Sequence, residues 1–184
     1  GGFIVHAKAQ AGKLAYGSPG NGTQGHLIAE QLKQIAGFEM THVPYKGAAL
    51  AVADLVAGHL PVTSTTLTTA ATQIKAGKAR ALAVSSERRV PDFPDVPTFA
   101  ELGYPQLSAS IWFSLSGPAG MPSEIVHRLN AEVRRILQLP DVRERLRPEG
   151  IEPGDLDPKE FTAFMAAEVK RWAPVVHAAG LKVD

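Results

Sequence analysis

The chain has 184 residues, a formal net charge of +1 at pH 7, and 45% hydrophobic against 20% charged residues. This composition is typical of an ordinary soluble protein with one large domain or two small lobes. The chain has no cysteine, which excludes a disulfide framework and a thiolate metal site or nucleophile. Runs of four basic residues or of 18 apolar residues are absent from the sequence, which argues against a nucleic-acid surface and a membrane span.

Strand and helix patterns alternate along the first part of the chain. We predict helices at residues 3–10, 23–36, 48–57 and 67–76, and strands at 13–16, 40–43, 60–63 and 80–84. Apolar residues spaced three and four positions apart indicate the helices, and Gly37, Gly58 and Gly77 fit their C-terminal ends. Strands separated by helices of this length predict βαβ units and a largely parallel sheet.

The pattern changes after a proline-rich stretch at residues 90–97. We predict a short helix at 98–102, a long strand at 106–116, and then helices at 123–137, 141–147 and 158–179. Ser123 is the expected cap of the first of these long helices, and Asp157 with Glu160 forms a capping-box pattern around Pro158 for the last. We therefore place a boundary between two parts of the chain near residue 110.

The most informative motif is a glycine-rich turn between the first predicted strand and the helix at 23–36. Glycines let backbone N–H groups approach a ligand, and a helix N-terminus attracts negative charge. We predict an anion-binding loop that suits a carboxylate, formed by Ser18, Gly20, Asn21, Gly22 and Thr23.

Other interpretations of this turn remain open. A phosphate-binding P-loop would need a lysine where Thr23 stands. The glycine spacing also matches the dinucleotide fingerprint of an oxidoreductase, but the next strand does not end in the acidic residue that would hold a ribose. Ser18 and Thr23 are also suited simply to cap the helix. A hydrolytic triad of Ser18, His26 and Asp54 lacks the usual nucleophile elbow.

Two further loops follow predicted strands and should lie at the same sheet edge, where open α/β sheets bind ligands. The first contains Tyr45, Lys46 and Gly47, and its lysine is suited to pair with an anion. The second contains Thr65 and Thr66, which offer hydroxyl groups. These loops complete the predicted binding site, for which we expect no metal and no cofactor.

The order of many short segments resembles the extracytoplasmic solute-binding proteins of tripartite tricarboxylate transporters, the Bug or TctC-like family. The matching segments span essentially the whole chain. They are residues 12–18, 20–23 with His26, 42–47, 74–78, 80–84, 94–98, 112–113, 118–120, 126 with 128–133, 142–146, 158–161, 170–172 and 179–182.

The resemblance implies an α/β, periplasmic-binding-protein-like fold of two lobes, a Venus flytrap, with one complete doubly wound lobe here. Residues 1–110 would form this second lobe, which carries the anion-binding loop. Residues 111–184 would form a crossover strand and the C-terminal helices of the first lobe. The N-terminal part of the first lobe, which bears the opposing half of the carboxylate clamp, is expected to lie outside this sequence.

The resemblance also implies a function without catalysis. Such a protein captures a small mono-, di- or tricarboxylate in the periplasm and delivers it to the membrane permease subunits of the transporter. Two aspartates common in the family are replaced here by Pro61 and Thr65, and we expect this to disfavour amino-acid ligands. The remaining alternatives are a nucleotide-dependent oxidoreductase and a remnant that no longer binds ligand. An isolated lobe would expose an uncovered apolar face, which predicts dimerisation.

Overall fold

The computed structural model describes residues 2–10, 12–146 and 151–181. The chain divides into two compact units, the first formed by Gly1–Trp112 with Pro174–Asp184 and the second by Phe113–Ala173. The first unit contains α1 (Gly2–Ala9), β1 (Ala15–Ser18), α2 (Gln24–Ala36), β2 (Thr41–Pro44), α3 (Ala48–Ala57), α4 (Leu67–Lys75) and the 3₁₀ helix η1 (Pro105–Leu107). The second contains α5 (Ser123–Leu137), α6 (Pro140–Leu146) and most of α7 (Pro158–Ala178).

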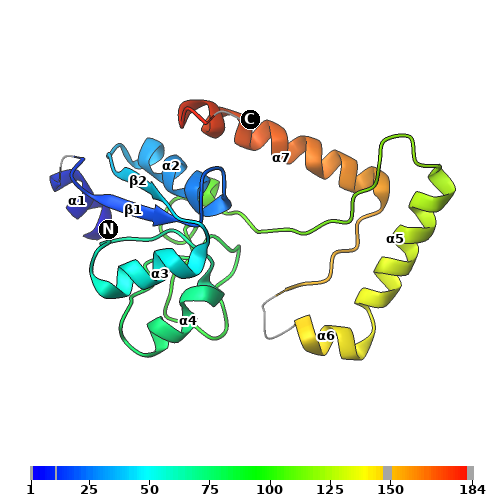
Figure 1. Cartoon of the computed structure of the whole chain (residues 1–184), viewed down its shortest axis with the longest axis horizontal. Helices are drawn as coiled ribbons and strands as arrows, with labels where there is room; N and C mark the ends of the chain where they lie inside the picture. Colours follow the sequence, from blue (N-terminus) through cyan, green and yellow to red (C-terminus); the bar gives the residue numbers. More distant parts are fainter. Residues whose placement is uncertain (1, 11, 147–150, 182–184) are drawn as a thin grey trace. The chain divides into compact units, whose positions relative to one another are not determined.

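Parallel strands form the centre of the first unit. β1 pairs with β2 in a register that places Tyr16 opposite His42. On its other side, Gly17 forms a single parallel bridge with Thr63. In the order β2, β1 and then the 62–64 segment, the connection through α2 and the connection through α3 run in opposite directions across the sheet. Because such crossovers are right-handed, α2 and α3 must lie on opposite faces, and Figure 1 shows α2 on one side of the strands and α3 with α4 on the other.

The helices begin and end close to where the sequence predicted. Gly37 and Gly58 adopt left-handed conformations, with φ of 65° and 80°, and each N–H caps the preceding helix. At the start of α7, Asp157 N–H donates to Glu160 and Glu160 N–H donates to Asp157, both at 2.8 Å, which confirms the capping box. Ser123 is the first residue of α5 rather than its cap, because Pro122 occupies the N-cap position.

Several predicted strands are wrong. Each of the segments 60–63 and 80–84 pairs with another segment through a single residue. These isolated bridges join Gly17 to Thr63 and Val84 to Thr98. The segment at 106–116 begins within η1 and then runs without strand pairing among the described residues. The predicted helix at 98–102 is instead the bridge residue Thr98 followed by turns. An apolar run predicts extended or buried chain, but a strand also requires a neighbouring backbone to complete its hydrogen bonds.

The apolar core lies in the first unit and includes Tyr16, Leu107 and Ala51, each fully buried. Burial of this kind is the main stabilising contribution to the unit. Within the described residues, no helix is sufficiently long and apolar to cross a membrane.

Candidate functional site

The three loops singled out in the sequence meet at one edge of the strands. Gly47 N–H donates to the Pro19 carbonyl at 3.0 Å, which joins the loop after β2 to the glycine turn after β1. Ser64 N–H donates to the Gly17 carbonyl at 2.9 Å, which joins the third loop to the same strand. This edge is the carboxyl end of the parallel strands. The chain changes direction between β1 and the 62–64 segment, and such a switch point is where α/β sheets hold ligands.

The glycine turn leads directly into the N-terminus of α2. Gly20 and Gly22 have φ of 148° and 72°, conformations that L side chains rarely adopt. Thr23 is the N-cap residue, but its hydroxyl makes no capping bond to the helix and instead donates to the Gly20 carbonyl at 2.8 Å. The simple capping interpretation therefore fails for Thr23, and the first N–H groups of α2 have no side-chain cap.

Ser18 lies beneath the turn and is fully buried. Its hydroxyl donates to the Gly20 carbonyl at 3.1 Å and accepts from the Gly20 N–H at 3.2 Å. It also shares a 2.7 Å hydrogen bond with His42 Nε2. These contacts show that the Ser18 hydroxyl fixes the shape of the turn, whereas Asn21 and Gly22 are exposed at its tip.

The loop after β2 is held by its tyrosine. Tyr45 Oη donates to Asp54 at 2.7 Å, and this hydrogen bond raises the pKa of Tyr45 and lowers the pKa of Asp54. Lys46 is exposed, and Gly47 has φ of 120° at the start of α3. The lysine is therefore the cation available at this edge from the predicted set of site residues.

The third loop packs tightly against the start of α2. A Cβ atom on Gly25 would lie 2.3 Å from the Ser64 carbonyl oxygen, so only glycine permits this approach. Thr66 is the N-cap residue of α4, but its hydroxyl contacts Thr69 at 2.8 Å and makes no capping bond. Thr65 Oγ1 is buried and has no hydrogen-bond partner among the described residues, which leaves it a polar group with unused bonding capacity.

A buried polar cluster supports the turn, and sequence reasoning did not find it. The imidazoles of His26 and His42 stack with ring centres 3.7 Å apart and planes 13° from parallel. Tyr16 stacks on His42 at 5.0 Å and donates through its hydroxyl to Glu30 at 2.6 Å. Lys33 donates to both carboxylate oxygens of Glu30 at 2.9 Å. We call these five residues the histidine cluster.

The cluster favours neutral imidazoles. Burial, together with the smaller effect of the nearby His26, lowers the pKa of His42 to about 4. Burial also lowers the pKa of His26, against the attraction of Glu30. Burial opposes ionisation of Glu30, but hydrogen bonds from Tyr16 and Lys33 outweigh it and lower its pKa. The carboxylate charge is therefore satisfied by Lys33 and Tyr16 while the two histidines remain uncharged near neutrality.

The hydrolytic triad considered from the sequence is not assembled. Ser18 contacts His42 rather than His26, and Asp54 contacts Tyr45 and lies 3.6 Å from His59. Because Ser18 is fully buried, its hydroxyl also lacks the access that a nucleophile needs. Among the described residues, no group of three or more histidine, aspartate or glutamate side chains is arranged to hold a metal ion.

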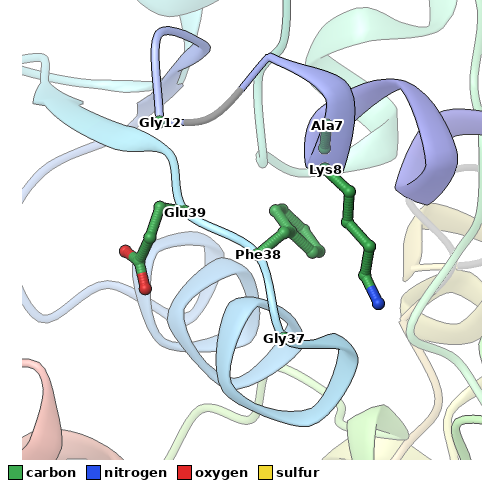
Figure 2. Close-up of a pocket in the computed structure, with 6 residues that line it drawn as sticks. All are labelled: Ala7, Lys8, Gly12, Gly37, Phe38 and Glu39. Carbon is green, nitrogen blue, oxygen red and sulfur yellow. The ribbon is translucent and has the colours of Figure 1, made fainter.

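Two pockets occur away from the three loops. Figure 2 shows the first, where α1 and the turn after α2 bring Lys8, Phe38 and Glu39 around one opening. It also includes Ala7, Gly12 and Gly37, and thus lies beside the C-terminal end of α2. The second lies between α3 and α4 and includes Val52, Thr69 and Lys78. Neither of these two pockets is lined by the residues of the glycine turn.

Comparison with known proteins gives a consistent result. The family model described as the tripartite tricarboxylate transporter family receptor, TctC, matches residues 2–181. Protein BugT of Bordetella pertussis is 36% identical over 98% of this chain, which spans 56% of BugT.

Two solved structures are similar over almost the whole of this chain. One is Rpa4515 of R. palustris with adipate, with 34% identity and a TM-score of 0.79 over 97% of this chain and 60% of that one. The other is MatC of Rhodopseudomonas palustris with bound malate, with 29% identity and a TM-score of 0.74 over 95% of this chain and 60% of that one. The chain therefore has the α/β fold of periplasmic solute-binding proteins and belongs to the TctC family of tripartite tricarboxylate transporter receptors.

Proposed function

We propose that this chain carries one half of a binding site for a small organic carboxylate and acts without catalysis. The observation that supports this most strongly is the glycine turn, which leads into the N-terminus of α2 with no side chain capping the helix. Backbone N–H groups and the positive end of the helix dipole attract a carboxylate without requiring a cationic side chain. The N–H groups of Gly20 and Gly22 are bound within the turn, so those of Asn21, Gln24 and Gly25 would hold the acid.

The surrounding loops provide the remaining contacts in this proposal. Lys46 lies on the neighbouring loop and adds a positive charge that steers an anion toward the edge. Thr65 and Thr66 line the other side, and the unpartnered Thr65 hydroxyl gains a hydrogen bond when ligand or water reaches it. Ser18 and Thr23 hold the turn through Gly20 and shape the site from within.

The related proteins favour the same ligand class. Rpa4515 is described with adipate and MatC with malate, and both are dicarboxylates. Thr65 is uncharged, so this edge offers no acidic partner there for the ammonium group of an amino acid. We infer that the ligand is a plain carboxylate, taken up in the periplasm and passed to membrane permease subunits as the family description suggests.

A matched pair of glycine variants tests the carboxylate site. Gly22 and Gly37 have φ of 72° and 65°, lie at opposite ends of α2, and have open space where a Cβ would be added. Both alanine variants therefore suffer similar backbone strain, of about 1 kcal/mol. Gly22→Ala should weaken adipate or malate binding by calorimetry about tenfold, while Gly37→Ala should bind like the parent chain.

Neutral and amino-acid ligands complete this test. Adipamide, which lacks the charge, and glutamate, which adds an ammonium group, should bind more weakly than the plain dicarboxylates. Equal loss of affinity in both glycine variants, or equal binding of adipamide and adipate, would contradict the proposed site. Turnover of a substrate or a co-purifying nucleotide would favour the enzyme alternative instead.

A further inference from the structure

The glycine turn depends on an imidazole. Gly22 N–H donates to His26 Nδ1 at 3.2 Å, which ties the exposed tip of the turn to the first turn of α2. An imidazole nitrogen accepts a hydrogen bond only when it carries no proton. His26 must therefore be neutral, with its proton on Nε2, for this contact to exist.

The second histidine extends the same control to the other side of the turn. His42 stacks on His26 at 3.7 Å and shares a hydrogen bond with the Ser18 hydroxyl, which in turn binds both the N–H and the carbonyl of Gly20. The two histidines thus hold the turn at Gly22 and, through Ser18, at Gly20. A positive charge on one ring disfavours a charge on the other at this distance.

The groups around the pair determine its response to acid. Glu30 and Lys33 lie on α2 with His26, Tyr16 comes from β1, and His42 comes from β2. Lys33 also lies 3.8 Å from the exposed Glu39. The carboxylate of Glu30 is already bound by Lys33 and Tyr16, so it offers limited compensation for a new positive charge on His26.

We propose that His26 is a positioning residue that holds the anion-binding turn only as a neutral imidazole, so that protonation in acid frees Gly22 and weakens carboxylate binding. Protonated Nδ1 is a donor that faces the Gly22 N–H donor, and the contact is then replaced by repulsion. The pKa of His26 is lowered by burial, and this places the transition below pH 6.5. The effect on affinity rests on the proposed function, whereas the change in the turn does not.

The first measurement needs no ligand. In the parent chain, the amide resonance of Gly22 should shift with pH between 7.5 and 4.5 and follow the imidazole titration of His26. The amide of Gly37 donates to the Lys33 carbonyl and provides an internal control that should not follow it. A Gly22 resonance that does not titrate, or that moves together with Gly37, would overturn the proposal whether or not the chain binds carboxylates.

Two substitutions then separate positioning from general structural support. His26→Asn keeps an acceptor near the Nδ1 position without a titrating group, and His26→Leu removes the acceptor. For the parent chain, adipate affinity should fall about tenfold for each pH unit below the transition. His26→Asn should bind at neutral pH and lose most of this dependence, while His26→Leu should bind weakly throughout.

Protonation of the ligand itself affects parent and variant equally, so the difference between their pH profiles isolates His26. An identical profile for the parent and His26→Asn would contradict the proposal. If no form binds adipate or malate at any pH, the proposed function fails, and the Gly22 titration still decides the positioning role.

Discussion

The strand edge of the first unit and the helices of the second use polar and apolar residues in opposite ways. Around β1, β2 and α2, charged and polar side chains are buried together, including Glu30, His26 and Ser18. Among the described residues of 113–173, none is buried, although α5 carries an apolar row. The members of that row are Ile125, Leu129, Val133 and Ile136, which remain 36–48% exposed.

This contrast teaches that amphipathic spacing and burial are separate properties. The row on α5 follows helical periodicity and correctly predicts a helix. Periodicity specifies which face is apolar but not what covers it. In the first unit the strands and helices cover one another. The side chains there pack closely around the ion pair of Lys33 with Glu30 and around two neutral histidines.

The largest expected effect comes from breaking the buried ion pair. Lys33 and Glu30 side chains are only 13% and 12% exposed, so Lys33→Met should lower the free energy of unfolding by about 4 kcal/mol, because it leaves Glu30 poorly compensated. The matched change in the second unit is Arg134→Met, whose partner Asp155 is 71% exposed, and it should cost less than about 1 kcal/mol. Urea denaturation measures both, and similar losses would break the comparison between the units.

A pair of leucines tests apolar packing in the same manner. Leu107 is fully buried, and Leu107→Ala should cost about 3 kcal/mol through lost burial and a residual cavity. Leu129 on α5 is 43% exposed, and Leu129→Ala should change stability by less than about 1 kcal/mol. A large loss at Leu129 that depends on protein concentration would instead show that the α5 row is covered in a dimer.

Stability should also fall in acid because of the first unit. The pKa of His42 is lowered from 6.5 to about 4, so the unfolded chain binds more protons than the folded chain between these values. The stabilisation is therefore present above pH 6.5 and is lost as pH falls toward 4. We expect a loss of about 2 kcal/mol by urea denaturation, after allowance for partial exposure. His42→Asn should flatten this dependence, and an unchanged slope would assign it to other groups.

Apart from the two control variants in the second unit, the smallest effect is expected at the start of α7. Asp157→Ala removes one of the two reciprocal capping bonds and should cost about 1 kcal/mol. The partner variant Glu160→Ala removes the other bond and tests whether the two act together. A loss of unfolding free energy well above the loss for Lys33→Met would contradict this order. It would show that the capping bonds of α7 stabilise the second unit more than its exposed side chains indicate.

The helices were the most predictable part of the fold. α2, α3 and α7 agree with the sequence within one residue, because glycine C-caps and the capping box act locally. The strands at 80–84 and 106–116 were wrong because pairing depends on a distant backbone that local pattern does not identify. The meeting of the three loops followed from parallel topology alone, since the carboxyl ends of parallel strands share an edge.

The support of the turn was less predictable than its position. The sequence offered His26 as a triad candidate, but its stacking on His42 depends on the register that pairs Tyr16 with His42. One signal was available, since a polar residue one turn inside α2 and another on β2 both follow from the predicted elements. The distance between the two rings could not be inferred without the register of β1 and β2. A shift of one residue would move the side chain of His42 to the other face of the sheet.

The central claim is that the glycine turn binds a carboxylate, and an amide-resonance titration of this chain with adipate tests it most directly. The largest changes are expected at residues 20–25, with smaller changes at 64–66 and none in α5 or α6. Changes centred instead on Phe38 and Glu39 would place the ligand in the pocket at the other end of α2 and contradict the account.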